Sequence, residues 1–343
     1  MRKTDDRVSF ITLLQAVGII LVIVGHATRI FYYPGGWYYH LPDVQSDLFN
    51  TLTRVIYTFH MPLFVFLSGY LCERTLSKNS SIKKFIIKRF KRLFIPYWVW
   101  GLLYSVPIWI YLKFPDANYK TFAIGKVMGH LWFLPLLLEV TLIYLILRLL
   151  SRKFNFIILI GLISLQFLNF ERYDCFAIFR IPEFLTYYFI GAKFFEIENI
   201  KIFSNRTLIN LTTLITTCGF IIIEYLLYNS AFKGMLRLIL AGILGVISLV
   251  LLSKILVKKY PFIVNNKITK FLSFNMFTIF LIHEPLLEII LKIINWGNLC
   301  SPIVTVFILF TGTVLSTSLL AIIINYINLT IKSKKNVNNC KQI

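Results

Sequence analysis

Two polar side chains interrupt the first long apolar stretch of the chain, and they lie on one line of the helix that this stretch predicts. Residues 8–31 read VSFITLLQAVGIILVIVGHATRIF, and about twenty apolar or small residues are enough to cross a bilayer. At 100° per residue, Gln15 and His26 fall within about 20° of each other and about 16 Å apart along the axis. A neutral imidazole can take a proton from a hydroxyl group. His26 is therefore a candidate general base; the alternative is a histidine that hydrogen-bonds a neighbouring helix for packing.

Other ionisable side chains interrupt further apolar segments. They are His60, His130 with the nearby Trp132, Arg180, Glu183, Glu224, His283 and Glu284. The topology set out below brings all of them to the outer half of one helical bundle. Exposure to lipid would be prohibitive there, so we expect them to line an interior cavity. Pro285 lacks a backbone N–H, so it should free the carbonyl of Leu281 and bend its helix.

Basic residues cluster in the stretch FIIKRFKRLFIPYW, residues 85–98. Lys88, Arg89, Lys91 and Arg92 form a basic turn or interfacial helix before Pro96. Lysine and arginine hold phosphate oxygens through charge-assisted hydrogen bonds. The stretch could therefore bind a polyanionic substrate such as acyl-CoA, whose pantetheine arm would reach into the bundle. The alternative is that these charges only anchor the chain at the inner face of the membrane.

The elements that must position these residues are membrane-spanning helices. Of the 343 residues, 57% are hydrophobic and 15% are charged, against about 25% charged in ordinary soluble domains. The apolar runs have helical length and lack the two-residue alternation of a β-barrel. We therefore predict an all-α, polytopic integral membrane bundle of about ten transmembrane helices. The predicted segments are 8–31, 52–72, 93–112, 130–150, 154–170, 176–196, 207–228, 235–257, 270–292 and 302–331.

Lysine and arginine are unevenly distributed between the loops, which orients the bundle. The stretch 32–51 carries none, whereas 73–92 carries eight. Positive charge marks cytoplasmic loops, so both termini are predicted to be cytoplasmic. The formal net charge of +21 follows this loop pattern and favours contact with anionic membrane lipids over nucleic acid. Residues 1–331 are predicted to form one membrane domain, followed by a short basic cytoplasmic tail at 332–343.

Neither a disulfide framework nor a metal site is indicated. The five cysteines are dispersed and odd in number. The histidines lack the HExxH spacing of a zinc hydrolase. We therefore expect no metal.

Four stretches carry a resemblance to a known family. They are AVGIILVIVGH at 16–26, FHMPLFVFLSGYL at 59–71, KRFKRLFIPYWVW at 88–100 and HLWFLPLLL at 130–138. In this order and at this spacing they resemble the membrane acyltransferase-3 family, and most closely its fucose O-acetylase-like branch. Members of that family O-acylate sugars in cell-envelope polysaccharides and related glycolipids.

The resemblance implies an integral membrane O-acyltransferase. It would move an acyl group, most simply acetyl, from cytosolic acyl-CoA to a hydroxyl of an envelope glycan or lipid-linked sugar. His26 would be the general base. The acceptor pocket or its support would come from His60, His130, Trp132, Arg180, Glu183 and His283. The donor acetyl-CoA would be held by Gln15, Lys88, Arg89 and Arg92.

Gln15 is the place where the sequence departs from the family pattern. Members usually carry arginine or lysine eleven residues before the histidine, and an amide cannot neutralise charge. Either the neighbouring basic stretch compensates, or the donor is held differently, or catalysis has been lost. The alternative function is an exporter of glycan or lipid-linked sugar that uses the same polar cavity as a path. A membrane scaffold or sensor is a third alternative.

Overall fold

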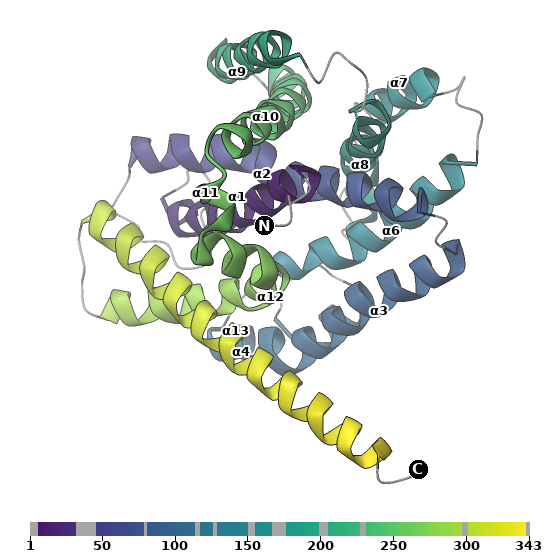
Figure 1. Cartoon of the computed structure of the whole chain (residues 1–343). Helices are drawn as coiled ribbons and strands as arrows, with labels where there is room; N and C mark the ends of the chain where they lie inside the picture. Colours follow the sequence, from purple (N-terminus) through teal and green to yellow (C-terminus); the bar gives the residue numbers. More distant parts are fainter. Residues whose placement is uncertain are drawn as a thin grey trace.

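A computed structural model of the chain describes residues 6–31, 46–78, 81–113, 117–125, 129–149, 155–166, 176–198, 205–226, 231–296 and 301–340. Within these ranges every regular element is a helix (Figure 1), so the predicted all-α class is confirmed. The elements are α1 (Asp6–Arg29), α2 (Asp47–Leu76), α3 (Ile82–Trp100), η1 (Gly101–Ser105), α4 (Val106–Tyr111), α5 (Tyr119–Ala123), η2 (Gly129–Trp132), α6 (Phe133–Leu147), α7 (Asn155–Leu165), η4 (Ile178–Arg180), α8 (Ile181–Ile197), α9 (Arg206–Leu226), α10 (Ala231–Lys259), α11 (Phe262–Asn265), α12 (Lys267–Trp296) and α13 (Pro302–Cys340).

Each predicted apolar segment coincides with a helix, but the helices differ in their capacity to cross a membrane. Seven helices in the described part of the chain are long and apolar enough: Ser9–Arg29, Asp47–Leu76, Ile82–Tyr111, Gly129–Leu147, Arg206–Leu226, Ile239–Lys259 and Pro302–Ile327. α7 has 11 residues and α8 has 17, which is short for a crossing. The crossings of α7, α8 and α12, and the cytoplasmic placement of both termini, stay predictions.

Two predicted boundaries look different in the structure. The basic stretch is helical, because α3 begins at Ile82 and continues through the π-helical turn η1 into α4. At the other end of the chain, the backbone of α13 continues to Cys340, past the boundary predicted at 331. Residues 341–343 of the predicted tail lie outside the described residues.

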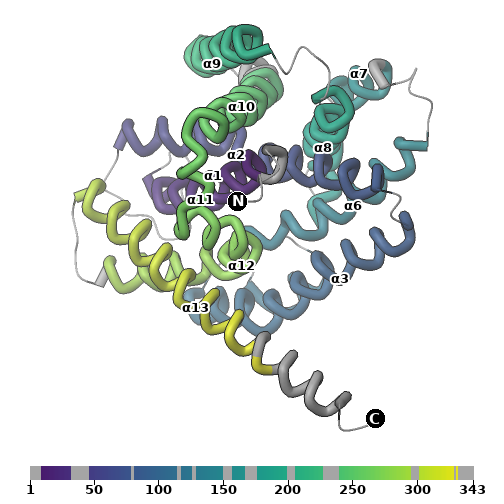
Figure 2. The backbone as a smooth tube through the Cα atoms, in the orientation of Figure 1, coloured from purple at the N-terminus to yellow at the C-terminus, as the bar shows by residue number. Residues whose placement is uncertain are grey.

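α1 lies between α2 and α12 and contacts both (Figure 2). It runs antiparallel to α2, since the Thr53 hydroxyl donates to the Thr28 hydroxyl at 2.7 Å while Gly18, ten residues earlier, lies against the ring of Phe64. Any Cβ at Gly18 would overlap that ring, with the phenyl Cζ only 2.8 Å away. Small residues on α1 therefore let α2 pack closely.

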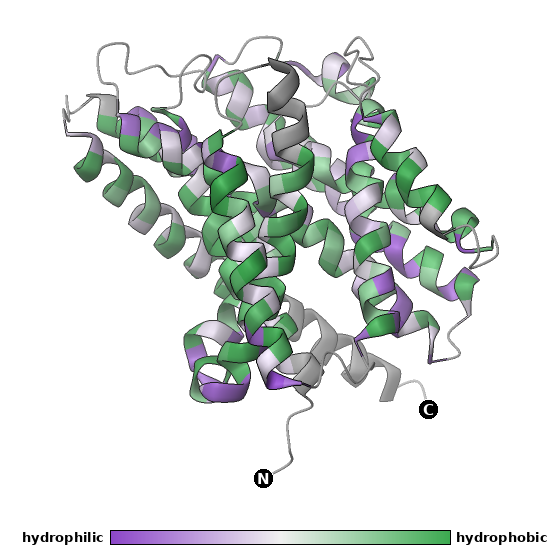
Figure 3. Cartoon of the chain, turned by 90° about the horizontal axis from the view of Figure 1, so that it is seen from above, coloured by the Kyte–Doolittle hydropathy of each residue, from purple (hydrophilic) through white to green (hydrophobic). Residues whose placement is uncertain are grey.

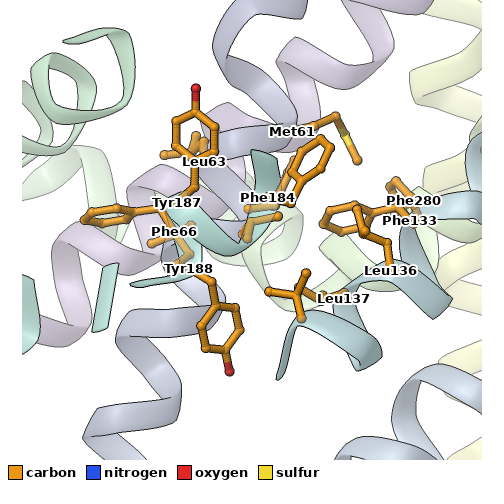
Figure 4. Packing of buried hydrophobic residues seen from close by; sticks show 14 of the residues in the cluster. Met61, Leu63, Phe66, Phe133, Leu136, Leu137, Phe184, Tyr187, Tyr188 and Phe280 are labelled. Atoms are coloured by element: carbon orange, nitrogen blue, oxygen red, sulfur yellow. The ribbon is translucent and has the colours of Figure 1, made fainter. Parts of the chain in front are cut away.

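A second close approach joins α2 to α8. A Cβ at Gly69 would overlap the carbonyl oxygen of Tyr188, and a Cβ at Gly191 would overlap that of Phe66. The core is aromatic: Figure 4 shows Phe66 of α2 with Tyr187 and Tyr188 of α8, and, farther away, the rings of Phe133 on α6 and Phe280 on α12 side by side. Many large hydrophobic side chains are exposed, and hydrophobic residues predominate along the helices in Figure 3, as a lipid environment requires.

Candidate active site

Three of the five histidines meet ring to ring in the buried interior. The rings of His26 on α1 and His283 on α12 have centroids 4.8 Å apart at an interplanar angle of 87°. The rings of His130 on η2 and His283 are also 4.8 Å apart, at 65°. All three side chains are buried. His40 lies outside the described residues.

His60 joins this set through one aromatic ring. The Tyr57 ring lies 4.7 Å from the ring of His60 and 6.1 Å from that of His26. The guanidinium of Arg29 lies over the same Tyr57 ring, 5.2 Å from its centroid. The Nδ1 of His60 is 2.9 Å from the carbonyl oxygen of Ile56. We call His26, His60, His130 and His283 the histidine group.

The small residues of α1 decide which way its polar residues face. A Cβ at Gly25 would stand 3.1 Å from the side chain of Ile56 and 3.2 Å from that of Tyr57 on α2. The Gln15 and His26 side chains, in contrast, meet α12: the Ser273 hydroxyl donates to the Gln15 amide oxygen at 2.7 Å, and His26 contacts His283. The polar stripe predicted on α1 therefore faces α12, and α1 and α12 run in the same direction.

Two carboxyl groups on α12 accompany the histidines. The Glu284 carboxylate lies 2.5 Å from His130 Nδ1 and also accepts the backbone N–H of His130. One turn later, Glu288 is fully buried and neither of its oxygens has a hydrogen-bond partner among the described residues. Glu288 was not predicted from the sequence. Its spacing of four from Glu284, which places both on one helix face, was the signal that could have found it.

The remaining predicted acceptor residues lie beside the histidine group rather than in ring contact with it. The guanidinium of Arg180 stacks on the Trp132 ring at 4.5 Å from its centroid, and Trp132 packs on Phe184 at 5.5 Å. Glu183 lies in the first turn of α8 and is half-buried. Since Trp132 and His130 share η2, these residues border the group at the start of α6 and α8.

Glu224 on α9 is buried inside the bundle and contacts α2. It accepts a hydrogen bond from the Thr58 hydroxyl at 2.8 Å and lies 3.8 Å from Arg54. Thr58 and His60 are two residues apart on α2, so their side chains point to nearly opposite sides of the helix. The sequence could indicate depth for Glu224 but not which face of α2 it meets.

The predicted donor-binding residues on α3 reach the bundle to different extents. Arg89 donates to the Ser68 hydroxyl on α2. The guanidinium of Arg92 lies over the Phe277 ring at 5.4 Å from its centroid, one turn along α12 from the serine that holds Gln15. Lys88 is exposed. Arg92 therefore approaches α12 near Gln15.

A buried ion-pair network lies toward the opposite ends of α2, α6 and α8. Glu73 accepts hydrogen bonds from Tyr144 and Arg148, both at 2.6 Å. Glu198 accepts from Tyr70 at 2.6 Å and from Lys254 at 2.9 Å. We call Tyr70, Glu73, Tyr144, Arg148, Glu198 and Lys254 the ion-pair network.

The chain forms an apolar helical bundle that buries imidazoles beside carboxyl groups, with a basic helix packed against it. Its long apolar helices indicate a multi-pass membrane protein. Among the described residues there is no group of three or more potential metal ligands. A family model described as an acyltransferase domain matches residues 8–322, and the chain belongs to the acyltransferase-3 family.

A curated relative covers a shorter stretch. Nodulation protein NolL of Sinorhizobium fredii (strain NBRC 101917 / NGR234) is 26% identical to the chain over 123 residues. The match covers 35% of this chain and 31% of that protein, so it spans about a third of the relative's length. No solved structure matches the chain.

Proposed function

We propose that the protein is an integral membrane O-acetyltransferase. It takes the acetyl group from cytosolic acetyl-CoA and places it on a hydroxyl of a cell-envelope glycan or lipid-linked sugar, in a bacterial-type plasma membrane. The observation that carries this proposal is the placement of His26. It combines the family match with an imidazole that is buried among other imidazoles and lies on the same stripe as Gln15.

His26 acts as the general base in this proposal. The acceptor hydroxyl gives its proton to the imidazole as its oxygen attacks the thioester carbonyl, so a C–O bond forms. The C–S bond then breaks, and the proton passes from His26 to the departing thiolate, leaving an acetyl ester and free CoA thiol. A base in this position contributes about 10²- to 10⁴-fold to the rate.

The donor is held by the basic residues of α3. Lys88, Arg89 and Arg92 bind the phosphates of CoA through charge-assisted hydrogen bonds. Arg92 supports this role because its guanidinium lies over Phe277, close to the Ser273 hydroxyl that bonds Gln15. In this arrangement Arg92 supplies the charge that Gln15 lacks. The thioester arm extends along α1 and α12 toward His26.

The acceptor approaches from the side of η2 and α8. Trp132 offers an aromatic face on which a sugar ring can stack, and Arg180 already covers part of it. Glu183, His60, His130 and His283 complete the surroundings of the acceptor hydroxyl. The match to the acyltransferase-3 family lends no support to the transport alternative.

Mass spectrometry of envelope glycans from cells with and without the protein tests the proposal. We expect an acetyl-sized mass difference on one glycan, and its loss when the cells carry His26→Ala in place of the normal chain. Identical glycan masses with and without the protein, at confirmed expression, would contradict the proposed reaction.

A further inference from the structure

Glu288 on α12 is a buried carboxyl group to which the proposed reaction assigns no role. Its side chain is fully buried, and neither carboxyl oxygen has a hydrogen-bond partner among the described residues. Burying a carboxyl group without a partner lowers the stability of the fold. Such a group is retained where binding or chemistry needs it.

The neighbouring carboxyl group, Glu284, already has its partners. It lies one turn earlier on α12, 2.5 Å from His130 Nδ1, and it also accepts the backbone N–H of His130. The other ring nitrogen of His130 lies 3.0 Å from the carbonyl oxygen of Leu281, which Pro285 leaves without a helical partner. Both nitrogens of His130 are therefore occupied, and neither can serve Glu288.

A second acceptor atom on this part of α12 also has no partner. The Nδ1 of His283 lies 2.7 Å from the carbonyl oxygen of Phe280, so the neutral ring carries its hydrogen on Nδ1 and a lone pair on Nε2. That Nε2 is buried and makes no hydrogen bond to a described residue. His283 and Glu288 are five residues apart, which is about 7.5 Å along the helix axis.

Electrostatic interactions connect Glu288 to the proposed base. Arg29 follows His26 by three residues on α1, and its charge acts on both His26 and Glu288. An ammonium group or a metal ion bound at Glu288 would be repelled by Arg29. A neutral ligand that donates hydrogen bonds, such as a sugar with free hydroxyl groups, fits these surroundings better.

We propose that Glu288 is a specificity-determining residue that binds two neighbouring hydroxyl groups of the acceptor glycan while a further hydroxyl lies at His26. An ionised carboxyl group accepts a hydrogen bond on each oxygen, and a neutral one accepts on one oxygen and donates from the other. Both forms therefore match a pair of hydroxyl groups. An acceptor without this pair would leave a buried carboxyl group unpaired and is rejected strongly.

The inference rests on the proposed acetyl transfer and adds the class of acceptor, a glycan with adjacent free hydroxyl groups. It gives the acceptor a hydrogen-bonding contact in addition to the stacking surface of Trp132. Lys292 lies one turn beyond Glu288 on the same face of α12, and its Nζ is 4.4 Å from the centroid of the Tyr111 ring on α4. Side chains on a helix lean toward its N-terminus, so Lys292 covers Glu288. The acceptor displaces this contact when it binds.

The test uses full-length variants purified in detergent and measures transfer of labelled acetyl from acetyl-CoA. The acceptor is glycan extracted from the envelope of cells that lack the protein, added over a range of concentrations. Glu288→Met should lower kcat/KM for this glycan about 100-fold and leave the KM for acetyl-CoA within about twofold of wild type. Glu288→Gln keeps one acceptor oxygen and has an N–H donor, so it should recover about tenfold of that loss.

Glu224→Gln is the matched control, because Glu224 is a buried carboxyl group whose partners are Thr58 and Arg54. Its kcat/KM for the glycan should stay within about twofold of wild type. The inference is overturned if Glu288→Met transfers acetyl like wild type, if it is no less active than Glu288→Gln, or if its KM for acetyl-CoA rises in step with the loss. A lower unfolding temperature of Glu288→Met would also overturn it, since Glu288 would then support the fold. Absence of transfer by the wild type would refute the proposed function itself.

Discussion

The ion-pair network and the histidine group are both buried polar regions of one bundle, but their partners are matched differently. In the network, Glu73 and Glu198 each accept hydrogen bonds from a tyrosine and from a cation. In the histidine group, imidazoles face imidazoles, and Glu288, one turn of α12 beyond Glu284, has no hydrogen-bond partner among the described residues.

This difference separates residues that stabilise the fold from residues that are kept for chemistry. A buried charge with satisfied partners ties helices together, and removing one partner is strongly destabilising. Unsatisfied buried groups lower stability and are retained where a reaction needs them. The ion-pair network joins α2, α6, α8 and α10, whereas the histidine group gathers titratable rings where a substrate can be deprotonated.

The largest stability effect should come from breaking the network. Glu73→Ala leaves Arg148 and Tyr144 without their buried acceptor, and we expect the free energy of unfolding to fall by about 3 kcal/mol. This value is at the lower end of the range for breaking a buried ion pair, because Arg148 is partly exposed. Thermal unfolding in detergent measures this. Glu73→Met combined with Arg148→Leu should restore most of the loss. An unchanged unfolding temperature for Glu73→Ala would remove the distinction between the two regions.

The next largest effect is expected on the binding of acetyl-CoA. Arg92→Ala should raise the KM for acetyl-CoA about tenfold with little change in kcat, because it removes a phosphate contact far from the reacting atoms. Lys83→Ala is the control, since Lys83 is an exposed residue of α3 that is not among the residues assigned to the donor, and its effect should be about threefold or less. A larger effect at Lys83 than at Arg92 would argue against donor binding along α12.

Glu288 should respond with the opposite sign to Glu73. Glu288→Met replaces a buried carboxyl group that has no described partner, and we expect the protein to gain about 1 kcal/mol of stability. The same thermal measurement detects the gain. A loss of stability comparable to that of Glu73→Ala would mean that Glu288 is part of the structural support.

The smallest effect is expected at Gln15. If Arg92 supplies the missing charge, Gln15→Arg should change the KM for acetyl-CoA by about threefold or less, and Gln15→Ala should have a similarly small effect. Kinetics in the same membranes measure both. A gain of tenfold or more for Gln15→Arg would show that the charge on α1 is needed and is not replaced by α3.

The sequence predicted the helices and the polar stripe of α1 because apolar length and the 3.6-residue period are local properties. It also predicted that Pro285 would free the carbonyl of Leu281. It could not predict that His130, 151 residues away, binds that carbonyl. Periodicity gives the face of a helix but not the neighbour that this face meets. For the same reason the sequence indicated the depth of Glu224 but not that its partners would be Thr58 and Arg54.

Transfer of labelled acetyl from acetyl-CoA to membrane glycan, compared between wild type and His26→Ala, tests the central claim most directly. We predict transfer by the wild type and a loss of about 10³-fold in the variant. The unfolding temperature of the variant should stay near that of wild type, since His26 lies outside the ion-pair network. Unimpaired transfer by a stably folded His26→Ala protein would contradict the account.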